Sequence, residues 1–581
     1  MTDVSASIAA STEAVTSRSP TAISGLARHG EAGHRADLLK GTAKAVRDSF
    51  LPRRPAAASM TPPWQRRTEQ WSTPRLAGPG ERAPASPRHE FQGDALTGSP
   101  SIETQHGHPG IVLATLSLAN VMALLDLFVV NVALHDIGVG LHYQSSLSDV
   151  AWVLNAYALF FGALLIPAGR FADRYGRKAT FILGLAVFTV ASLACAVSPD
   201  LWVLVGFRCV QAAGAAMIIP ASLGLVLTTL PPDRVKHGVR VWAVSGAAAG
   251  SIGPVVGGLL TALSWRWIFI INLPIGIAAV LVTWKLIPNV RHDRTTRMPD
   301  LFGSLMIVVT IGAISLGLLN GSSWGWGSAK IIGSWVVAVA AAVAFVVSTR
   351  RAAVPVIDLK MFRSRVFSAS NIAIVIAAAI LGIQLLGLSL FLQQSWHWST
   401  ITTGLALAPG PAAVLGASLI VPRLNQRFPI GAVVASGFVL TAVGQVLMVL
   451  TLRHGVHNYA AAILPGWVVI GFGLGFTVPT IIGSATADLP PEQSATGSAV
   501  VNSGRQFGGV FGASILVVVL GKAEVTGDPS RFYELWWVAV ALCAAAVVVS
   551  LGLTPKRQPA KADVTVPVVA AATDSTNSSV A

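Results

Sequence analysis

The sequence predicts an all-α integral membrane protein with about fourteen transmembrane helices. Hydrophobic residues make up 53% of its 581 residues and charged residues only 12%, and the mean hydropathy is +0.64. Apolar stretches of about twenty residues, each able to cross about 30 Å of hydrocarbon as a helix, recur from residue 111 to residue 553. This composition excludes a chain made of several soluble domains.

The expected membrane spans follow one another along the chain, with ends placed to within several residues. Glycine and proline interrupt many of them, which helices buried in a bundle tolerate because neighbouring helices satisfy the freed backbone groups. In chain order the spans are 111–135, 149–168, 179–198, 201–229, 238–262, 266–287, 301–320, 331–349, 367–393, 401–421, 430–450, 459–485, 493–520 and 532–553.

The net charge of +15 comes from basic residues that occupy alternate short loops. A nucleic-acid-binding module would gather them on one surface, so we expect no nucleic-acid partner and interpret them by the positive-inside rule. The rule predicts a multi-pass protein of the cytoplasmic membrane, in contact with the lipid bilayer, with both termini in the cytoplasm. The cytoplasmic basic residues are Arg170, Arg174, Arg177, Lys178, Arg234, Lys236, Arg240, Arg291, Arg294, Arg297, Arg350, Arg351, Lys360, Arg363, Arg365, Arg423, Arg427, Lys556, Arg557 and Lys561.

The distribution of spans predicts five segments. Residues 1–108 are rich in Ala, Ser, Pro, Arg and Gly without a hydrophobic period, so we expect a disordered tail. Residues 109–288 form a six-helix bundle, 289–366 add two helices with long basic linkers, and 367–554 form a second six-helix bundle. Residues 555–581 form a second disordered tail. Transporters are often built from two such related halves, with the substrate site between them.

The sequence shows no motif typical of an enzyme or a cofactor-binding protein. The three cysteines are isolated in apolar surroundings, and no metal-ligand cluster, catalytic triad or cofactor fingerprint is present. A phosphate-binding loop of the G-x-x-x-x-G-K-[ST] type is also missing, which disfavours ATP as a direct energy source. We therefore expect a protein that is not an enzyme, binds no cofactor and draws on a proton gradient.

Asp126 lies inside the first apolar span, in the run Leu124-Leu125-Asp126-Leu127-Phe128. A charge at this depth costs about 2.5–3.5 kcal/mol on insertion scales, so such residues usually face a polar cavity and mark a path for protons, ions or substrate. A structural ion pair is the alternative interpretation of this carboxylate.

A ten-residue loop between the second and third spans resembles the signature loop of the major facilitator superfamily, G-x-x-x-D-R-x-G-R-[KR]. In that family the loop latches two halves together on the cytoplasmic side. Its glycines allow tight turns and close helix approach, its aspartate can bind a cation or a helix N-terminus, and its basic residues stay at the inner surface. The matching residues are Gly169, Asp173, Arg174, Gly176, Arg177 and Lys178.

Further motifs support the resemblance and narrow it to the fourteen-helix drug:proton antiporter branch. Residues 208–216 resemble R-x-x-Q-G-x-G-A-A, with Ala212 in place of a glycine, and residues 264–276 resemble W-R-W-x-F-x-[IV]-N-x-P-x-G. Residues 125–134 and the following His135 resemble L-D-x-T-[IV]-V-N-V-A-L-P, from which Phe128 and His135 depart. The fifth span resembles the antiporter motif, whose glycines permit close helix contact and whose proline bends the helix: Gly246, Gly250, Gly253, Pro254, Gly257 and Gly258.

The resemblance implies how the candidate residues act. Asp126 exchanges a proton as the protein changes conformation, and Arg208, also inside the membrane, is its first candidate partner. Polar and aromatic side chains of other spans are expected to line a substrate cavity, although interfacial anchoring or packing explains them about as well. They are Asn131, Asn155, Tyr157, Gln211, Gln393, Gln394 and Arg505.

These observations predict an efflux transporter that exchanges protons for a hydrophobic or amphipathic small molecule by alternating access. Because the second half shows no obvious intramembrane acid, monovalent cationic or neutral compounds are expected in preference to dications. A dedicated exporter of one endogenous metabolite or antibiotic is the alternative within transport. A receptor or scaffold that keeps the fold without transport is an alternative of another class, and the sequence leaves the oligomeric state open.

Overall fold

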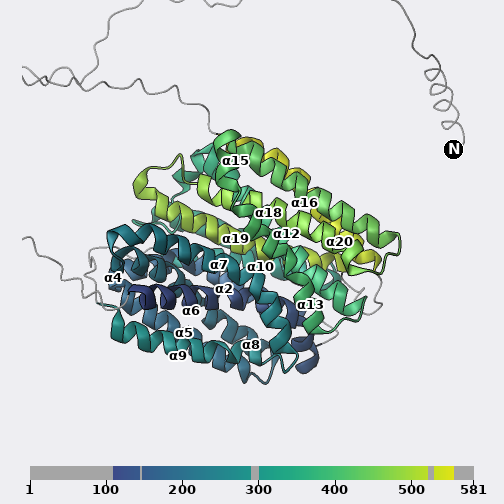
Figure 1. The fold of residues 1–581 in the computed structure, drawn as a ribbon, viewed down its shortest axis with the longest axis horizontal. Helices are drawn as coiled ribbons and strands as arrows, with labels where there is room; N and C mark the ends of the chain where they lie inside the picture. Colours follow the sequence, from purple (N-terminus) through teal and green to yellow (C-terminus); the bar gives the residue numbers. More distant parts are fainter. Residues whose placement is uncertain (1–108, 144–146, 289–299, 521–528, 555–581) are drawn as a thin grey trace, which may run out of the picture. The chain divides into compact units, whose positions relative to one another are not determined.

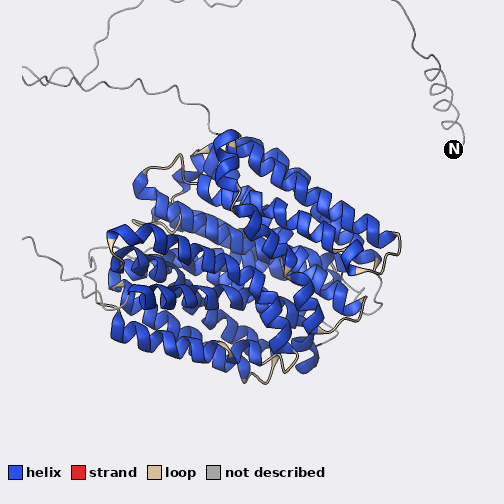
Figure 2. Ribbon diagram, in the orientation of Figure 1, coloured by secondary structure: helices blue, strands red, loops and turns tan. Residues whose placement is uncertain are grey.

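The computed structural model describes residues 109–143, 147–288, 300–520 and 529–554. The regular structure within these ranges is helical throughout (Figure 2). Fourteen of the described helical segments are long and apolar enough to cross a membrane, which confirms the fold class predicted from the sequence. The two predicted disordered tails, 1–108 and 555–581, lie outside the described residues.

The first six spans pack together as one bundle, drawn in purple to teal in Figure 1. Within it α2 packs against α7, α5 packs against α6, and α6 also contacts α4. The elements are α2 (Pro109–Gly140), α3 (Leu147–Val150), α4 (Trp152–Tyr175), α5 (Arg177–Ala196), α6 (Leu201–Thr229), α7 (Pro232–Thr261), α8 (Trp267–Ile270) and α9 (Asn272–Leu286).

The last six spans form the second bundle, drawn in green to yellow in Figure 1. Its main contacts join α12 to α19, α16 to α18, and α14 to α18. The elements are η2 (Leu359–Arg363), α12 (Arg365–Gln394), α13 (Thr400–Leu407), α14 (Pro409–Ser418), α15 (Val421–Arg427), α16 (Ile430–Arg453), α17 (Tyr459–Ala462), α18 (Leu464–Ser484), α19 (Pro491–Leu520), α20 (Ser530–Ser550) and η4 (Leu551–Leu553).

Two additional helices stand between the bundles in the chain, α10 (Leu301–Trp324) and α11 (Ala329–Arg351). They pack against each other, and α10 also contacts α4 of the first bundle and α19 of the second. Asp300 ties the pair together, because its carboxylate accepts a hydrogen bond from the Gly303 amide (2.9 Å) and one from the Ser348 hydroxyl. The limits at 288/289 and 366/367 between the segments stay a prediction.

Besides the short turn at Ala151 between α3 and α4, three spans that the sequence predicts as continuous are interrupted. Breaks at Ile271, Ala408 and Ile463 separate α8 from α9, α13 from α14, and α17 from α18. A proline follows each break, at positions 274, 409 and 465, and proline removes the amide that the preceding turn would use. Side chains bind carbonyls at one of these breaks: Trp467 Nε1 donates to the Leu407 carbonyl (3.0 Å), and the Tyr459 hydroxyl donates to Ala406 (2.7 Å).

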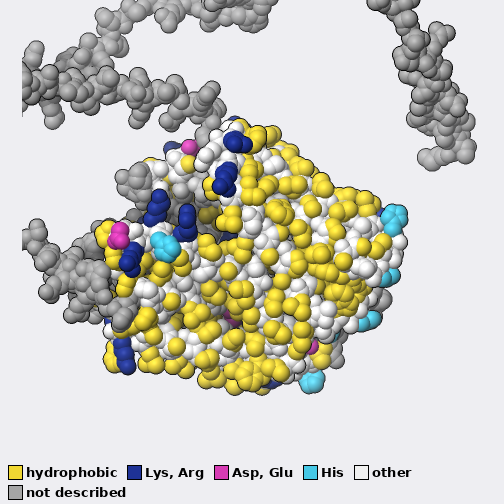
Figure 3. Space-filling view, viewed as in Figure 1, with side chains coloured by type: hydrophobic (Ala, Val, Ile, Leu, Met, Phe, Trp, Pro, Cys, Tyr) yellow, Lys and Arg dark blue, Asp and Glu magenta, His cyan; other side chains and the backbone are white. Residues whose placement is uncertain are grey.

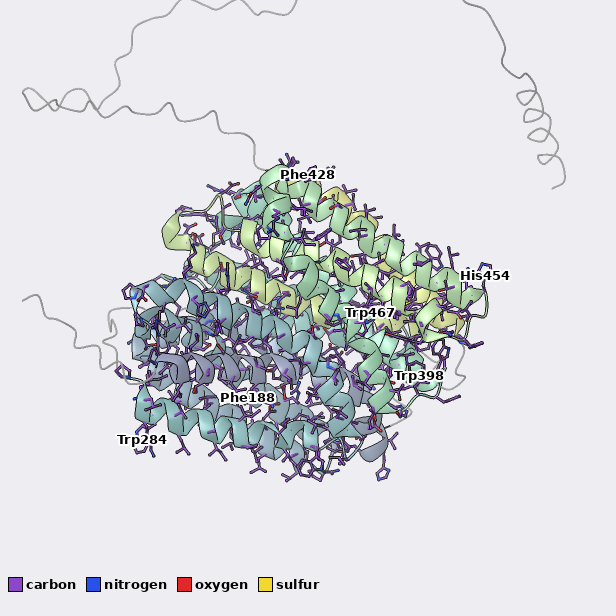
Figure 4. The ribbon with its side chains drawn as sticks, in the orientation of Figure 1. Phe188, Trp284, Trp398, Phe428, His454 and Trp467 are labelled. Carbon is purple, nitrogen blue, oxygen red and sulfur yellow. The ribbon has the colours of Figure 1, made fainter. Side chains whose placement is uncertain are left out.

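The two ends of the helical bundles differ in charge. Figure 3 shows Lys and Arg gathered toward the left of the visible face, whereas several histidines mark the right. We call the end where α4 joins α5 the basic end, and the opposite end, where α5 stops at Ala196 and α7 at Thr261, the far end. Trp284 and Trp398 lie toward opposite ends in Figure 4, as interfacial tryptophans of a membrane protein do.

Apolar packing closes the far end of the molecule. There a single buried cluster includes Val132 and Leu134 of α2 together with Leu388 and Leu392 of α12, so it joins both bundles. Toward the basic end the first bundle has a buried cluster of its own. The second bundle's cluster also takes in Ala163 and Ile166 of α4, Ile307 of α10 and the linker residue Val356. We call the shared cluster the far-end seal.

Candidate functional site

Asp126 and Arg208 form a buried ion pair inside the first bundle. The Asp126 carboxylate on α2 binds the Arg208 guanidinium on α6, and their side chains are 1% and 0% exposed. Burying two charges costs several kcal/mol per ion unless the geometry is good and further hydrogen bonds satisfy them. The pair therefore needs a polar shell, and the surrounding helices provide one.

Amide and hydroxyl groups from three other positions complete the carboxylate's shell. Gln211 Nε2 donates to Asp126 Oδ1 (3.0 Å) and Asn272 Nδ2 donates to the same oxygen (3.3 Å). Both amides also donate to the Ser192 hydroxyl, at 3.1 and 3.0 Å. Arg208 and Gln211 lie three residues apart on α6, a spacing that places them on one helix face, and Arg208 Nη1 donates to Gln211 Oε1 (2.8 Å).

The guanidinium of Arg208 is held from its other side by α4. Its Nε donates to the Val153 carbonyl (3.1 Å), and its Cζ lies 4.1 Å from the centre of the Tyr157 ring. Tyr157 is itself anchored, because its hydroxyl donates to the Ala123 carbonyl (3.0 Å). A cation over a desolvated aromatic face gains about 2 kcal/mol or more. Aspartate, arginine and their partners thus connect α2, α4, α5, α6 and α9.

Two polar atoms of this network have no hydrogen-bond partner among the described residues: Arg208 Nη2 and Asn272 Oδ1. Leaving such buried atoms unpaired costs about 1–3 kcal/mol each. The network is therefore under-satisfied in this conformation.

The sequence indicated Asp126, Arg208 and Gln211 but did not indicate two members of the shell, Asn272 and Ser192. Asn272 stands in the motif of residues 264–276 and is the sole amide in that stretch, so its polarity in an apolar span was an available signal. Ser192 offered no such signal, because serine is common in membrane helices.

The signature loop binds mainly its own bundle. Gly176 separates α4 from α5 with φ of 99°, a backbone conformation that side chains rarely adopt. Asp173 pairs with Arg177 (3.3 Å), and Arg177 also donates to the Gly224 carbonyl of α6 (2.9 Å). Lys178 Nζ donates to the Trp284 carbonyl of α9 (3.0 Å).

Two bonds from α4 reach the second bundle. Arg170 Nη2 contacts the Thr496 hydroxyl (3.4 Å), and the Ser503 hydroxyl donates to the Gly162 carbonyl (2.6 Å). Gly169 lies within α4, and Arg174 stacks on Tyr175 with 5.6 Å between its Cζ and the ring centre. The link between the bundles near the basic end therefore runs through α4 and α19.

The antiporter-motif glycines of α7 face two different neighbours. Four of them, Gly246, Gly250, Gly253 and Gly257, lie against α2, the helix that carries Asp126. A Cβ at Gly257 would stand 2.8 Å from the Val129 carbonyl oxygen, so only glycine permits this approach. Phe128, the departure from the family motif, packs on Gly250 and Gly253 and fills the groove that they leave.

Pro254 and Gly258 face the opposite bundle. Gly404 of α13 packs on the Pro254 carbonyl, and Gly258 packs on Thr400, with 3.2 Å from an added Cβ to Ile401 Cα. These contacts lie beside the far-end seal. One face of α7 thus packs against α2, which carries Asp126, and another face packs against α13 of the second bundle.

Replacing Gly258 by leucine is expected to force the far end open, because the new side chain would overlap the Thr400 backbone. The distance between spin labels at Val139 and His454, at the far ends of α2 and α16, should increase. Gly206→Leu is the matched control, since a Cβ there meets nothing within 4 Å. An unchanged label distance in Gly258→Leu would contradict this role.

The candidate cavity residues are dispersed. Tyr157 and Gln211 belong to the Asp126 network, and Asn155 is buried in α4 with its Nδ2 unpaired among the described residues. Asn131 Nδ2 donates to the Leu127 carbonyl of its own helix (3.0 Å).

At the far-end seal, Gln393 Nε2 of α12 donates to the Val132 carbonyl of α2 (3.1 Å). Gln394 helps line a small cavity of about 20 Å³ with Leu134 and Leu390. Arg505 stands apart from both groups, on α19. Within the described ranges, no three His, Cys, Asp or Glu side chains gather as a metal site would need.

Comparisons with known proteins agree with this architecture. Residues 116–513 match the family described as the Major Facilitator Superfamily. The chain is similar to a methylenomycin A resistance protein of Bacillus subtilis, with 32% identity over 457 residues that cover 78% of this chain and 97% of the relative. It is also similar to a tetracenomycin C resistance and export protein of Streptomyces glaucescens, with 30% identity over 74% of this chain and 79% of that one.

A solved structure shows the same fold. It is a bacterial homologue of the human lysosomal transporter Spinster in an inward-facing conformation, with a TM-score of 0.57 and 14% identity, covering 77% of this chain and 98% of that chain. The resistance proteins among the relatives agree with the drug antiporter branch that the motifs resemble. The chain belongs to the Major Facilitator Superfamily.

Proposed function

We propose that this protein is a proton-coupled efflux transporter that exports hydrophobic or amphipathic compounds across the cytoplasmic membrane. The observation that carries the proposal is the Asp126–Arg208 pair, a titratable carboxylate held within a membrane bundle by exchangeable polar partners. Neutral amides share the pair's hydrogen bonds: Gln211 accepts one from Arg208, and both Gln211 and Asn272 donate to Asp126.

The exchange of a proton at Asp126 would change the charge balance of the first bundle. A protonated Asp126 no longer neutralises Arg208, and a lone guanidinium in a low-dielectric interior is costly. Arg208 must then find water or another acceptor, which requires the helices around it to separate. Because α7 packs on α2 through its glycines and on α13 through Gly258, a shift of α2 is passed to the far-end seal.

The placement of charge sets which end of the protein faces the cytoplasm. The basic end is assigned to the cytoplasm by the positive-inside rule, so the far-end seal is assigned to the outer side. With that seal closed, a compound enters from the cytoplasm and leaves when the seal opens. The proton gradient supplies the free energy, and no cofactor takes part.

The relatives suggest two ranges of substrate. Several are named for resistance to a single antibiotic, such as methylenomycin A or puromycin, and others are named multidrug resistance proteins. Our first candidate is an exporter of several compounds, and the second is a dedicated exporter of one metabolite or antibiotic. A panel of antibiotics tested on an efflux-deficient strain that expresses the protein distinguishes them, since the second predicts protection against one compound alone.

Proteoliposomes test the proton coupling directly. The uphill movement of two fluorescent xanthene dyes, rhodamine 6G and fluorescein ethyl ester, is measured under an imposed pH gradient. We expect at least one of the two dyes to accumulate. Internal pyranine should report a matching proton flux. Nigericin should abolish the accumulation by collapsing the gradient. Accumulation that persists after nigericin, or that occurs without proton movement, would refute antiport.

A further inference from the structure

Arg505 is a second arginine inside the membrane, and it is not part of the Asp126 network. It lies in the first half of the apolar span Thr496–Leu520 of α19. Its Nε is buried without a hydrogen-bond partner, and Arg505 forms no ion pair with any side chain that the structure describes. An unpaired cation at this depth is costly, which makes a functional role the default interpretation.

The contacts of α19 show which way this side chain faces. Ser503 bonds to Gly162 of α4, and Gly508 packs on Val375 of α12. Phe507 shares an apolar cluster with Ile311 of α10 and also lies against Gly162 of α4. Arg505 precedes Phe507 by two residues, which is about 200° of rotation, so it lies almost opposite α10. Arg505 also follows Ser503 by two residues, so it points away from α4 as well as from α10.

The composition of this face agrees with a water-filled cavity. Ser498, Asn502, Arg505 and Gly509 follow one another at helical spacing and all are partly exposed. A face in contact with lipid would instead carry large apolar side chains. The stripe stops where Ala513 and Leu516 are buried in the far-end seal.

The net charge near this stripe depends on where the ionisable side chains of the spans lie. Asp126 is already neutralised by Arg208. The other acidic side chains described within the spans lie near helix ends: Asp136, Asp149, Asp173, Asp233 and Glu534. Arg505 is therefore a positive charge on this partly exposed stripe with no acidic partner among the described side chains. A guanidinium binds oxygen anions through charge-assisted and often bidentate hydrogen bonds.

We propose that Arg505 is a substrate-binding residue and that the preferred cargo carries an anionic oxygen group, such as a carboxylate, phenolate or enolate. This inference rests on the proposed export function and specifies its substrate class. It departs from the monovalent cationic or neutral cargo that the sequence suggested, because the structure leaves Arg505 without an acidic partner among the described side chains.

Binding of two dyes of opposite charge tests the proposal without any gradient. Fluorescein ethyl ester is an anion and rhodamine 6G a cation, and both carry a xanthene ring and an ethyl ester. Quenching of tryptophan fluorescence in the purified full-length protein gives both affinities. We expect the anion to bind more tightly, and Arg505→Gln to weaken its binding by about tenfold or more while leaving rhodamine 6G unaffected or bound more tightly.

Two further variants keep the test decisive. Arg505→Lys keeps the positive charge and should retain most of the preference for the anion. Asn502→Ala, one turn away on the same stripe, should change both affinities by a similar small factor. Equal affinities for the two dyes, no binding of either, or an equal loss for both in Arg505→Gln would overturn the proposal. Binding that follows these expectations without proton-driven uptake would refute the export function alone.

Discussion

Replacing Asp126 by asparagine is expected to abolish proton-driven accumulation in proteoliposomes, down to the level of protein-free vesicles. Asparagine keeps the size of the side chain and can still accept hydrogen bonds from Gln211 and Asn272, but it cannot take up a proton. Dye binding in detergent should persist, because the variant leaves the α19 stripe intact. The measurement is dye uptake under an imposed pH gradient, together with the proton flux reported by internal pyranine.

Asp200→Asn is the matched control for this loss. Asp200 caps α6, where its carboxylate accepts a hydrogen bond from the Trp202 amide (2.8 Å), and asparagine caps helices about as well. It removes one acid from the same bundle without touching the network. Full uphill transport by Asp126→Asn would refute the coupling role of the acid, whatever the control shows.

Replacing Arg208 by alanine should have the largest effect on stability. The change leaves the Asp126 carboxyl group buried, at 1% exposed, and without its cation. Breaking a buried pair by removing one partner costs about 3–5 kcal/mol, a large part of the stability of a typical protein. We expect a marked fall in the melting temperature of the purified protein, or failure to accumulate in the membrane.

The double variant Asp126→Asn with Arg208→Gln separates stability from function. Two neutral amides can still hydrogen-bond to each other and to Gln211, so the melting temperature should recover most of the loss. Transport should stay absent because the titratable group is gone. If the double variant were as unstable as Arg208→Ala alone, the two side chains would not be coupled in the way that the geometry indicates.

Several features of the fold could be predicted because they depend on local composition. A membrane span needs about twenty apolar residues, and the hydrophobic stretches show these directly. The breaks at Ile271, Ala408 and Ile463 were missed, although Pro274, Pro409 and Pro465 were visible. Prolines such as Pro167 and Pro220 stand inside continuous helices, so proline alone does not decide where a membrane helix is interrupted.

The candidate site was predictable to the extent that motifs encode it. Asp126 and Arg208 stand in two motifs, and their pairing was expected. Tyr157 was assigned to the substrate cavity, but the structure places it under the Arg208 guanidinium. Ser192 joined the network without any signal in the sequence, because its role depends on which helix α5 faces.

The sequence by itself determined how many times this chain crosses the membrane, where its positive charges lie and which carboxylate stands in the apolar interior, since solvation energy in a bilayer depends on each residue and its neighbours in the chain. The tertiary structure alone decided which of the buried charges neutralise each other. Arg208 reaches Asp126 across 82 residues of sequence, whereas Arg505 meets no acid among the described side chains. The physical reason is that ion pairing depends on distance in space, which helix packing sets.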